Sequence, residues 1–282
     1  MKITLAKHTG FCFGVKRAIE KAYQSLRLYK GKKKVYMLGE IVHNEEVVEK
    51  LKRKGLISIS SLKALPPKSL LILKAHGTEK NIYQKIKKKN IKSLDLTCPQ
   101  VLKIHRKALS LQKEGYRIII FGDKNHAEIK ALTSYLKNFI VIEKKRDLKN
   151  KELSGKIALL LQSTQSLEES LEILKILKKI NPRTLFINTI CPDTQLRQKE
   201  VIELSKNNDK VIVAGSKKSA NTKRLYRLSK KYNKKTYWLN RPESIKKNNF
   251  EKKDRIAIIS GASTPQETVE NIIKRLKKLY SE

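Results

Sequence analysis

The stretch Arg117–Glu128, RIIIFGDKNHAE, runs from an apolar, β-branched segment directly into a polar loop that contains His126 and Glu128. A short apolar run that ends at a glycine is typical of a strand buried on both faces. In parallel α/β sheets, functional groups lie just beyond the carboxyl ends of such strands. The stretch therefore predicts a parallel α/β fold whose chemistry is located at the strand ends.

Five more segments repeat this pattern of an apolar run followed by a small polar loop. With the first, the six runs are Val35–Leu38, Leu70–Leu73, Arg117–Phe121, Ile157–Leu161, Val211–Val213 and Ile256–Ile259. Stretches with helical periodicity lie between them, at Val15–Tyr29, Gln100–Glu114, Leu167–Ile180 and Gln195–Lys206. Strands that alternate with helices in this way predict parallel sheets.

The three cysteines of the chain, Cys12, Cys98 and Cys191, follow the same rhythm. Each is expected just before a helix, and a proline follows the second and the third, which suits a first helical turn. The unit of cysteine, helix, strand, loop, helix, strand and loop occurs three times, with a period of about 90 residues. We therefore predict three similar α/β modules with small, mostly parallel sheets in a pseudo-threefold arrangement around a central cluster cavity.

The expected modules cover residues 13–97, 98–190 and 191–282. Because Cys12 starts the first module, the N-terminal strand within residues 1–12 is expected to pack on the third.

The composition favours a cytoplasmic protein. The chain has 282 residues, and it shows neither an apolar run long enough to span a membrane nor the apolar core of a signal peptide. Three widely spaced cysteines argue against a disulfide framework. The net charge of +38 would suit nucleic acid, but the lysines are spread along the whole chain and aromatic residues make up only 6%. We expect no specific nucleic-acid binding and no membrane association.

The cysteines allow three interpretations. They could be buried free thiols, as isolated cysteines often are. They could bind zinc, although the paired cysteine spacing of structural zinc sites is absent. Their equivalent positions in a repeat favour an iron–sulfur cluster, in which three thiolates would leave one iron without a protein ligand.

Three of the five histidines, His43, His76 and His126, each follow an expected strand end beside small or polar residues. Such histidines could cap helices, or they could bind an anion together with exposed backbone N–H groups. His105 falls within an expected helix, where we predict an ordinary, partly buried side chain. Glu128 is the one carboxylate in this group, and a carboxyl group beside a cluster and an anion can act as a proton donor.

The remaining strand-end loops are rich in hydroxyl groups. They contain Ser163, Ser219, Asn221 and Ser263. Serine and asparagine are preferred helix caps, and hydroxyl and amide groups at helix N-termini also form phosphate-binding sites.

Seven short motifs occur in an order that resembles the 4-hydroxy-3-methylbut-2-enyl diphosphate reductase family, over residues from about 3 to about 276. The motifs are Gly10–Val15, Ile41–Asn44, Ala75–Gly77, Thr97–Pro99, His126–Glu128, Ser219–Asn221 and Gly261–Ser263. Each is short, but seven motifs in order, together with three correctly placed cysteines, form a specific signal.

The resemblance implies a set of roles. It implies one [4Fe–4S] cluster on Cys12, Cys98 and Cys191, with a unique iron that no protein residue ligates. It implies that Glu128, His126 and Ser163 are catalytic. Residues that would bind the diphosphate of a prenyl diphosphate substrate are His43, His76, His126, Ser219, Asn221 and Ser263. The basic surface suggests an acidic electron donor such as ferredoxin or flavodoxin.

Two positions depart from the usual motif of the family. Ser163 stands where a threonine is usual, and it keeps the hydroxyl group. Ala220 stands where a serine is usual, so this position could offer only its backbone to a diphosphate. A structural protein with a redox-inert cluster would leave the loop histidines and Glu128 without a role.

Overall fold

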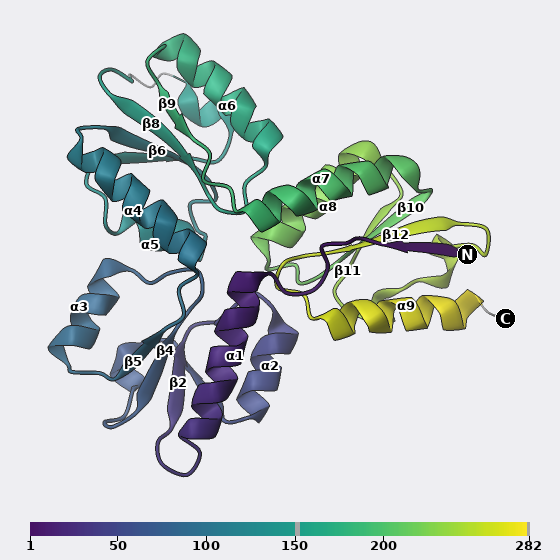
Figure 1. Cartoon of the computed structure of the whole chain (residues 1–282), viewed down its shortest axis with the longest axis horizontal. Coiled ribbons are helices and arrows are strands. Elements are labelled where there is room, and N and C mark those ends of the chain that lie inside the picture. The colour runs from purple at the N-terminus through teal and green to yellow at the C-terminus, as the bar shows by residue number, and fades with distance from the viewer. Residues whose placement is uncertain (150–152, 281–282) are drawn as a thin grey trace. The chain divides into compact units, whose positions relative to one another are not determined.

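The computed structural model describes residues 1–149 and 153–280, which form three four-stranded parallel sheets with helices around them (Figure 1). The predicted α/β class is therefore confirmed. The strands are β1 (Lys2–Leu5), β2 (Val35–Leu38), β3 (Leu56–Ile59), β4 (Leu70–Leu73), β5 (Ser93–Asp95), β6 (Arg117–Phe121), β7 (Phe139–Ile142), β8 (Ile157–Leu161), β9 (Leu185–Ile187), β10 (Lys210–Ala214), β11 (Thr236–Leu239) and β12 (Arg255–Ser260).

The helices are α1 (Phe13–Leu28), α2 (Glu45–Arg53), α3 (Lys80–Lys88), α4 (Pro99–Lys113), α5 (Ala127–Thr133), α6 (Leu167–Ile180), α7 (Pro192–Asn207), α8 (Ala220–Tyr232) and α9 (Gln266–Tyr280). The four predicted helices are confirmed as α1, α4, α6 and α7, and the described residues form five more. Among the described residues, no helix combines the length and the hydropathy that crossing a bilayer requires.

The chain divides into two compact units. Unit 1 comprises residues 1–16, 43–48 and 192–282, and it contains the sheet β1-β12-β10-β11. Unit 2 comprises residues 17–42 and 49–191, and it contains the sheets β3-β2-β4-β5 and β7-β6-β8-β9. The module bounds at 13–97, 98–190 and 191–282 stay a prediction.

All three sheets share one strand order. In each sheet of unit 2, the first and third strands in chain order are central, the second lies outside the first, and the fourth lies outside the third. In unit 1, β10, β11 and β12 take the first, second and third of these positions. In unit 1 the fourth position belongs to β1, which pairs in parallel with β12 from Lys2 opposite Arg255 to Leu5 opposite Ile258. The N-terminal strand therefore completes the sheet that the C-terminal part of the chain begins.

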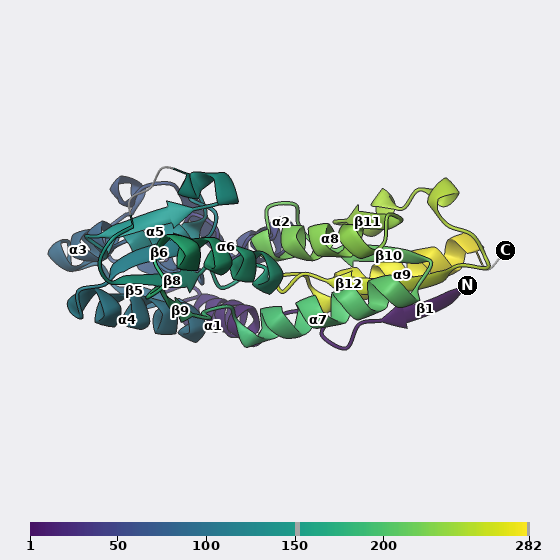
Figure 2. The same cartoon turned by 90° about the horizontal axis from the view of Figure 1, so that it is seen from above.

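Alternating side chains on the central strands form two cores in unit 1. Ile212 and Ile258 pack with α9, whereas Val213 and Ile259 pack with α7 and α8. Side chains of a strand alternate between the two faces of a sheet, so an all-apolar strand requires helices on both faces. Figure 2 shows the same unit from above, with α7 and α8 along the sheet that contains β10 and β12.

The sheet β7-β6-β8-β9 of unit 2 is built in the same way. Ile119 and Leu159 face α6, whereas Ile118 and Leu160 face α4 and α5. All four side chains are fully buried.

His105 on α4 is buried, with 9% of its surface exposed, and its ring centroid lies 5.5 Å from that of Tyr135. Burial lowers its pKa to about 4, although the negative charge of Asp95 acts in the opposite direction. The expected buried role of this histidine is confirmed, and the imidazole is neutral in the folded protein near neutral pH.

The burial of His105 predicts a loss of stability in acid. In the unfolded chain a histidine has a pKa near 6.5, so between about pH 6.5 and pH 4 the unfolded state binds a proton that the native state does not. The free energy of unfolding should therefore fall as the pH drops through this window, by up to about 3 kcal/mol from this group. In urea titrations between pH 7 and pH 5, His105→Gln should show a shallower dependence on pH than the parent chain. Equal slopes for the two proteins would contradict this assignment.

Candidate active site

Each cysteine lies between the fourth strand of a sheet and the start of a helix. Cys12 follows β1 and precedes α1, Cys98 follows β5 and precedes α4, and Cys191 follows β9 and precedes α7. All three are half-buried, and none of them forms a disulfide. The prediction that every cysteine comes just before a helix is confirmed, and the N-terminal end of a helix stabilises negative charge, which suits thiolate ligands.

The backbone of each cysteine is bonded to a loop at the end of a central strand. The N–H of Cys12 donates to the carbonyl of Ala262 at 3.0 Å, and that of Cys98 donates to the carbonyl of Ala75 at 2.9 Å. The N–H of Cys191 donates to the carbonyl of Ser163 at 2.8 Å. The three acceptors lie just after β12, β4 and β8, the third strand of each sheet. These bonds therefore place each cysteine beside a residue expected to act on substrate, which is Ser263, His76 or Ser163.

Unit 2 brings together Glu128 and Ser163. The carboxylate of Glu128, which is 2% exposed, accepts the N–H of Ser163 at 2.7 Å through Oε1 and its hydroxyl at 2.5 Å through Oε2. The hydroxyl group kept at position 163 is thus in direct contact with the only carboxylate of the expected site. Such a contact allows a proton to move between the two side chains.

His126 caps the helix that carries Glu128. Its Nδ1 accepts the backbone N–H of Glu128 at 3.2 Å, so the ring proton of the neutral side chain resides on Nε2. The ring of His76 packs edge-on against that of His126, with the centroids 5.4 Å apart. The helix begins at Ala127, which shortens the expected loop and places Glu128 in the first turn of α5.

Gln162 is a residue of this region that the sequence reasoning missed. It is 1% exposed, its Oε1 accepts the N–H of Asp123 at 2.8 Å, and its Nε2 donates to the hydroxyl of Thr164 at 3.1 Å. It therefore ties the loop after β6 to the loop after β8. The available signal was a polar side chain directly after a fully apolar strand.

Unit 1 brings together hydroxyl and amide groups at the start of α8. Ser219 caps this helix by accepting the N–H of Thr222 at 3.3 Å, and Ser263 donates to the carbonyl of His43 at 3.4 Å. Asn221 is 4% exposed, and neither Oδ1 nor Nδ2 has a hydrogen-bond partner among the described residues. A buried amide without partners is costly, so Asn221 is suited to bind a ligand.

Gly261 allows the loop that contains Ser263 to approach α8. A Cβ atom at this position would lie 1.9 Å from Oγ1 of Thr222, which is far closer than any real contact. Only a glycine fits here. The close approach places the loop after β12 against the helix that carries Asn221, with Ala220 as the first residue of that helix.

The expected site residues thus fall into two groups, one in each unit. Unit 1 contains Cys12, His43, Ser219, Asn221 and Ser263. Unit 2 contains His76, Cys98, His126, Glu128, Ser163 and Cys191. Every one of them follows a strand at its carboxyl end, and those expected to contact substrate follow the two central strands, where ligands bind in open α/β sheets.

The strand order and the placement of the cysteines define an α/β protein of three similar sheets, each with an edge strand that leads to one cysteine at the start of a helix. Residues 3–277 match the model of the LytB protein family. The chain belongs to this family, the 4-hydroxy-3-methylbut-2-enyl diphosphate reductases, as the resemblance predicts.

Two curated relatives cover almost the whole chain. The 4-hydroxy-3-methylbut-2-enyl diphosphate reductase of Caldanaerobacter subterraneus subsp. tengcongensis is 36% identical over 285 residues, which are 100% of this chain and 99% of that protein. The enzyme of the same name from Campylobacter jejuni subsp. jejuni is 37% identical over 280 residues, which are 98% of each chain.

Two solved structures are also similar to this chain. The E-1-hydroxy-2-methyl-but-2-enyl-4-diphosphate reductase from Plasmodium falciparum has a TM-score of 0.93 and 32% identity, over 98% of this chain and 88% of that one. A second structure, of (E)-4-hydroxy-3-methyl-but-2-enyl diphosphate reductase, has a TM-score of 0.72 and 34% identity, over 98% of this chain and 99% of that one.

The tight contact at Gly261 predicts a compensating pair of substitutions. Gly261→Ala should lower the thermal unfolding midpoint by several degrees, because the added methyl group overlaps the hydroxyl of Thr222. Adding Thr222→Ala removes the hydroxyl at 1.9 Å and leaves a milder contact at 3.0 Å, so the double variant should regain part of the loss. Thr222→Ala alone is the control, because it gives the effect of losing the hydroxyl without the added methyl group. A double variant no more stable than Gly261→Ala would contradict the proposed overlap.

Proposed function

We propose that this chain reduces 4-hydroxy-3-methylbut-2-enyl diphosphate to isopentenyl diphosphate and dimethylallyl diphosphate in the cytoplasm, as the last step of non-mevalonate isoprenoid precursor synthesis. One observation carries the proposal beyond family membership. Ser163 donates its N–H and its hydroxyl to Glu128 and accepts the N–H of Cys191 through its carbonyl. A buried carboxyl group is thus connected through one residue to an expected metal ligand.

The cofactor of the proposed enzyme is one [4Fe–4S] cluster on Cys12, Cys98 and Cys191, with one iron not ligated by protein. The donor set fits such a group, because all three cysteines are half-buried, form no disulfide and lie at helix starts. When bound, the cluster would supply two electrons one at a time and a Lewis-acidic iron for the substrate hydroxyl.

The diphosphate is the proposed ligand of the loop histidines and of the α8 start. Ser219, Asn221 and Ser263 would donate to its oxygens from unit 1, where the N-terminal end of the 13-residue α8 adds exposed N–H groups and a favourable dipole. His43, His76 and His126 complete the proposed ligand set. For His126 the donor would be Nε2–H, because Nδ1 is already an acceptor.

The reaction breaks the bond between the allylic carbon and its hydroxyl oxygen. It consumes two electrons and two protons, releases one water, and forms one C–H bond at either end of the allyl group. Glu128 is the proposed proton donor, and Ser163 would pass the proton between its hydroxyl and the carboxyl group. His126 would position both the diphosphate and the backbone of Glu128.

The decisive experiment is anaerobic reconstitution of the full chain, followed by iron and sulfide counting and an assay of reduced-dye oxidation with the hydroxylated substrate. About four irons per chain with substrate-dependent turnover would support the proposal, and Cys98→Ser should lose both. A colourless protein that contains only zinc after careful reconstitution would refute it.

Glu128→Gln should separate proton delivery from binding. Loss of a positioned acid typically reduces turnover by about 10²–10⁴-fold. We expect this loss in kcat, with iron content and KM for the substrate close to those of the parent chain. Glu203→Gln, at an exposed position on α7, is the matched control and should leave kcat unchanged. A Glu128→Gln variant with parental kcat would exclude Glu128 as the proton donor.

The electron donor is proposed to be an acidic protein such as ferredoxin or flavodoxin, since the chain has a net charge of +38. Electrostatic attraction between exposed charges is screened by salt. Turnover with reduced ferredoxin should therefore fall severalfold between about 50 and 300 mM salt, whereas turnover with a small uncharged reductant should not. Equal salt dependence with the two reductants would contradict charge-guided docking.

A further inference from the structure

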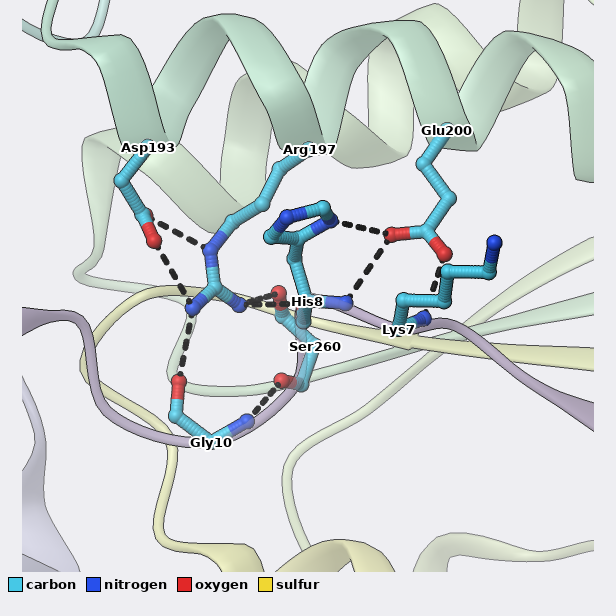
Figure 3. Close-up of polar contacts among 7 residues, drawn as sticks. All are labelled: Lys7, His8, Gly10, Asp193, Arg197, Glu200 and Ser260. Carbon is cyan, nitrogen blue, oxygen red and sulfur yellow. Dashed lines mark hydrogen bonds and ion pairs between the residues drawn. The ribbon is translucent and has the colours of Figure 1, made fainter.

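The most buried charged side chain in the described part of unit 1 is Arg197 on α7, with 2% of its surface exposed. Its guanidinium points toward the loop that leads from β1 to Cys12 (Figure 3). Neither the sequence reasoning nor the proposed mechanism gives this residue a role. A buried charge is tolerated only when it is paired and fully hydrogen-bonded, so its contacts show what it does.

Arg197 donates to three backbone carbonyls from two segments. Nη1 donates to the carbonyls of His8 at 2.7 Å and Ser260 at 2.9 Å, and Nη2 donates to that of Gly10 at 3.0 Å. His8 and Gly10 belong to the loop before Cys12, whereas Ser260 ends β12. The guanidinium therefore joins the loop before Cys12 to the end of the central strand beside it.

The remaining donors of Arg197 hold Asp193 in the first turn of the same helix. Nε donates to Oδ2 of Asp193 at 2.7 Å, and Nη2 lies 3.4 Å from Oδ1. Asp193 is two residues after Cys191 in the chain. The guanidinium of Arg197 thus binds both the segment after Cys191 and the loop before Cys12. The planar guanidinium of arginine, with its five N–H donors, suits such a set of acceptors better than the ammonium group of lysine does.

Glu200, one turn further along α7, binds the complementary groups of the same loop. Its carboxylate accepts hydrogen bonds from the backbone N–H groups of Lys7 and His8; the distance from the N–H of His8 is 3.1 Å. The ring Nδ1 of His8 also lies 3.1 Å from this carboxylate. Arg197 binds carbonyl oxygens while Glu200 binds N–H groups. Figure 3 shows both side chains extending from α7 to the loop.

The loop has two more attachments that depend on its path. The N–H of Gly10 donates to the hydroxyl of Ser260 at 2.9 Å, and Gly10 has a φ of +72°. The N–H of Cys12 then reaches the carbonyl of Ala262. Because these bonds follow one another from His8 through Gly10 to Cys12, a displacement of Gly10 would also displace Cys12.

We propose that Arg197 is the positioning residue for Cys12: it fixes the backbone of residues 8–10 against α7 and β12, and so fixes the position of the Cys12 thiol. The role of that thiol as a cluster ligand rests on the function proposed above. The placement of the thiol itself does not, so the two can be tested separately.

The first test measures thiol reactivity in the full-length, metal-free chain. Iodoacetamide labelling under anaerobic conditions, followed by peptide mass spectrometry, gives a separate rate for each cysteine. Arg197→Met should raise the labelling rate of Cys12 at least tenfold relative to Cys98, which serves as the internal reference. Arg197→Lys keeps a charge but cannot reach all the acceptors, so its Cys12 rate should fall between those of Arg197→Met and the parent.

Lys210→Met is the matched control for the loss of a buried cation. Lys210 is 6% exposed and pairs with Asp254 at 2.8 Å, before the opposite end of β12 in the same unit. Lys210→Met should destabilise unit 1 without altering the labelling rate of Cys12. If Lys210→Met raised that rate as much as Arg197→Met at equal loss of thermal stability, the effect would be general loosening and the proposal would be wrong.

The second test uses the reconstituted protein. With a chelator present, Arg197→Met should lose its iron and its visible absorbance at least tenfold faster than the parent, whereas Lys210→Met should match the parent. Parental rates of both iron loss and Cys12 labelling in Arg197→Met would overturn the proposal. If the parent chain itself takes up no iron while Arg197→Met still exposes Cys12, the proposed function fails and the positioning role of Arg197 stands.

Discussion

The parallel pairing of β1 with β12 is the interaction on which the arrangement of unit 1 depends. It places the first strand of the chain where β5 and β9 lie in the other two sheets, so that Cys12 leaves an edge strand as Cys98 and Cys191 do. The register of this pair also fixes the start of the loop that Arg197 and Glu200 bind. Without this pairing, the chain before Cys12 would not be held beside β12, and the hydrogen bond from Cys12 to Ala262 would not be positioned. One of the three equivalent cysteines would then have no fixed place.

The central strands could be predicted from the sequence, but of the edge strands only the N-terminal one could. Arg117–Phe121 and Ile157–Leu161 are apolar on both faces, because helices cover each side of their sheet. An edge strand such as Ser93–Asp95 is short and mostly exposed, so its composition resembles that of a loop. Strand order, by contrast, follows once the repeat is recognised, because each sheet must place its two apolar strands at the centre.

The site residues divide in a similar way. The loop histidines and Glu128 could be identified because each follows a predictable strand end, and the cysteines because each precedes a predictable helix. Arg197 could not, because a basic residue within a predicted helix ordinarily indicates an exposed face. Only the tertiary structure shows that this side of α7 is buried against backbone carbonyls. Every residue has a backbone carbonyl, so the sequence does not indicate which carbonyls need a side-chain donor. The role of Gln162 could not be predicted for the same reason, since its partners include the backbone of Asp123.

The pairing of residues 2–5 with residues 255–258 also has a consequence for synthesis on the ribosome. The two sheets of unit 2 consist of consecutive chain, so both can close while the rest of the protein is still being made. The sheet of unit 1 can close only after β12 has been synthesised, so β1 lacks its pairing partner until the end of elongation. The Cys12 thiol is therefore the last of the three to be set in place, and loading of a cofactor that needs all three is restricted to the finished chain.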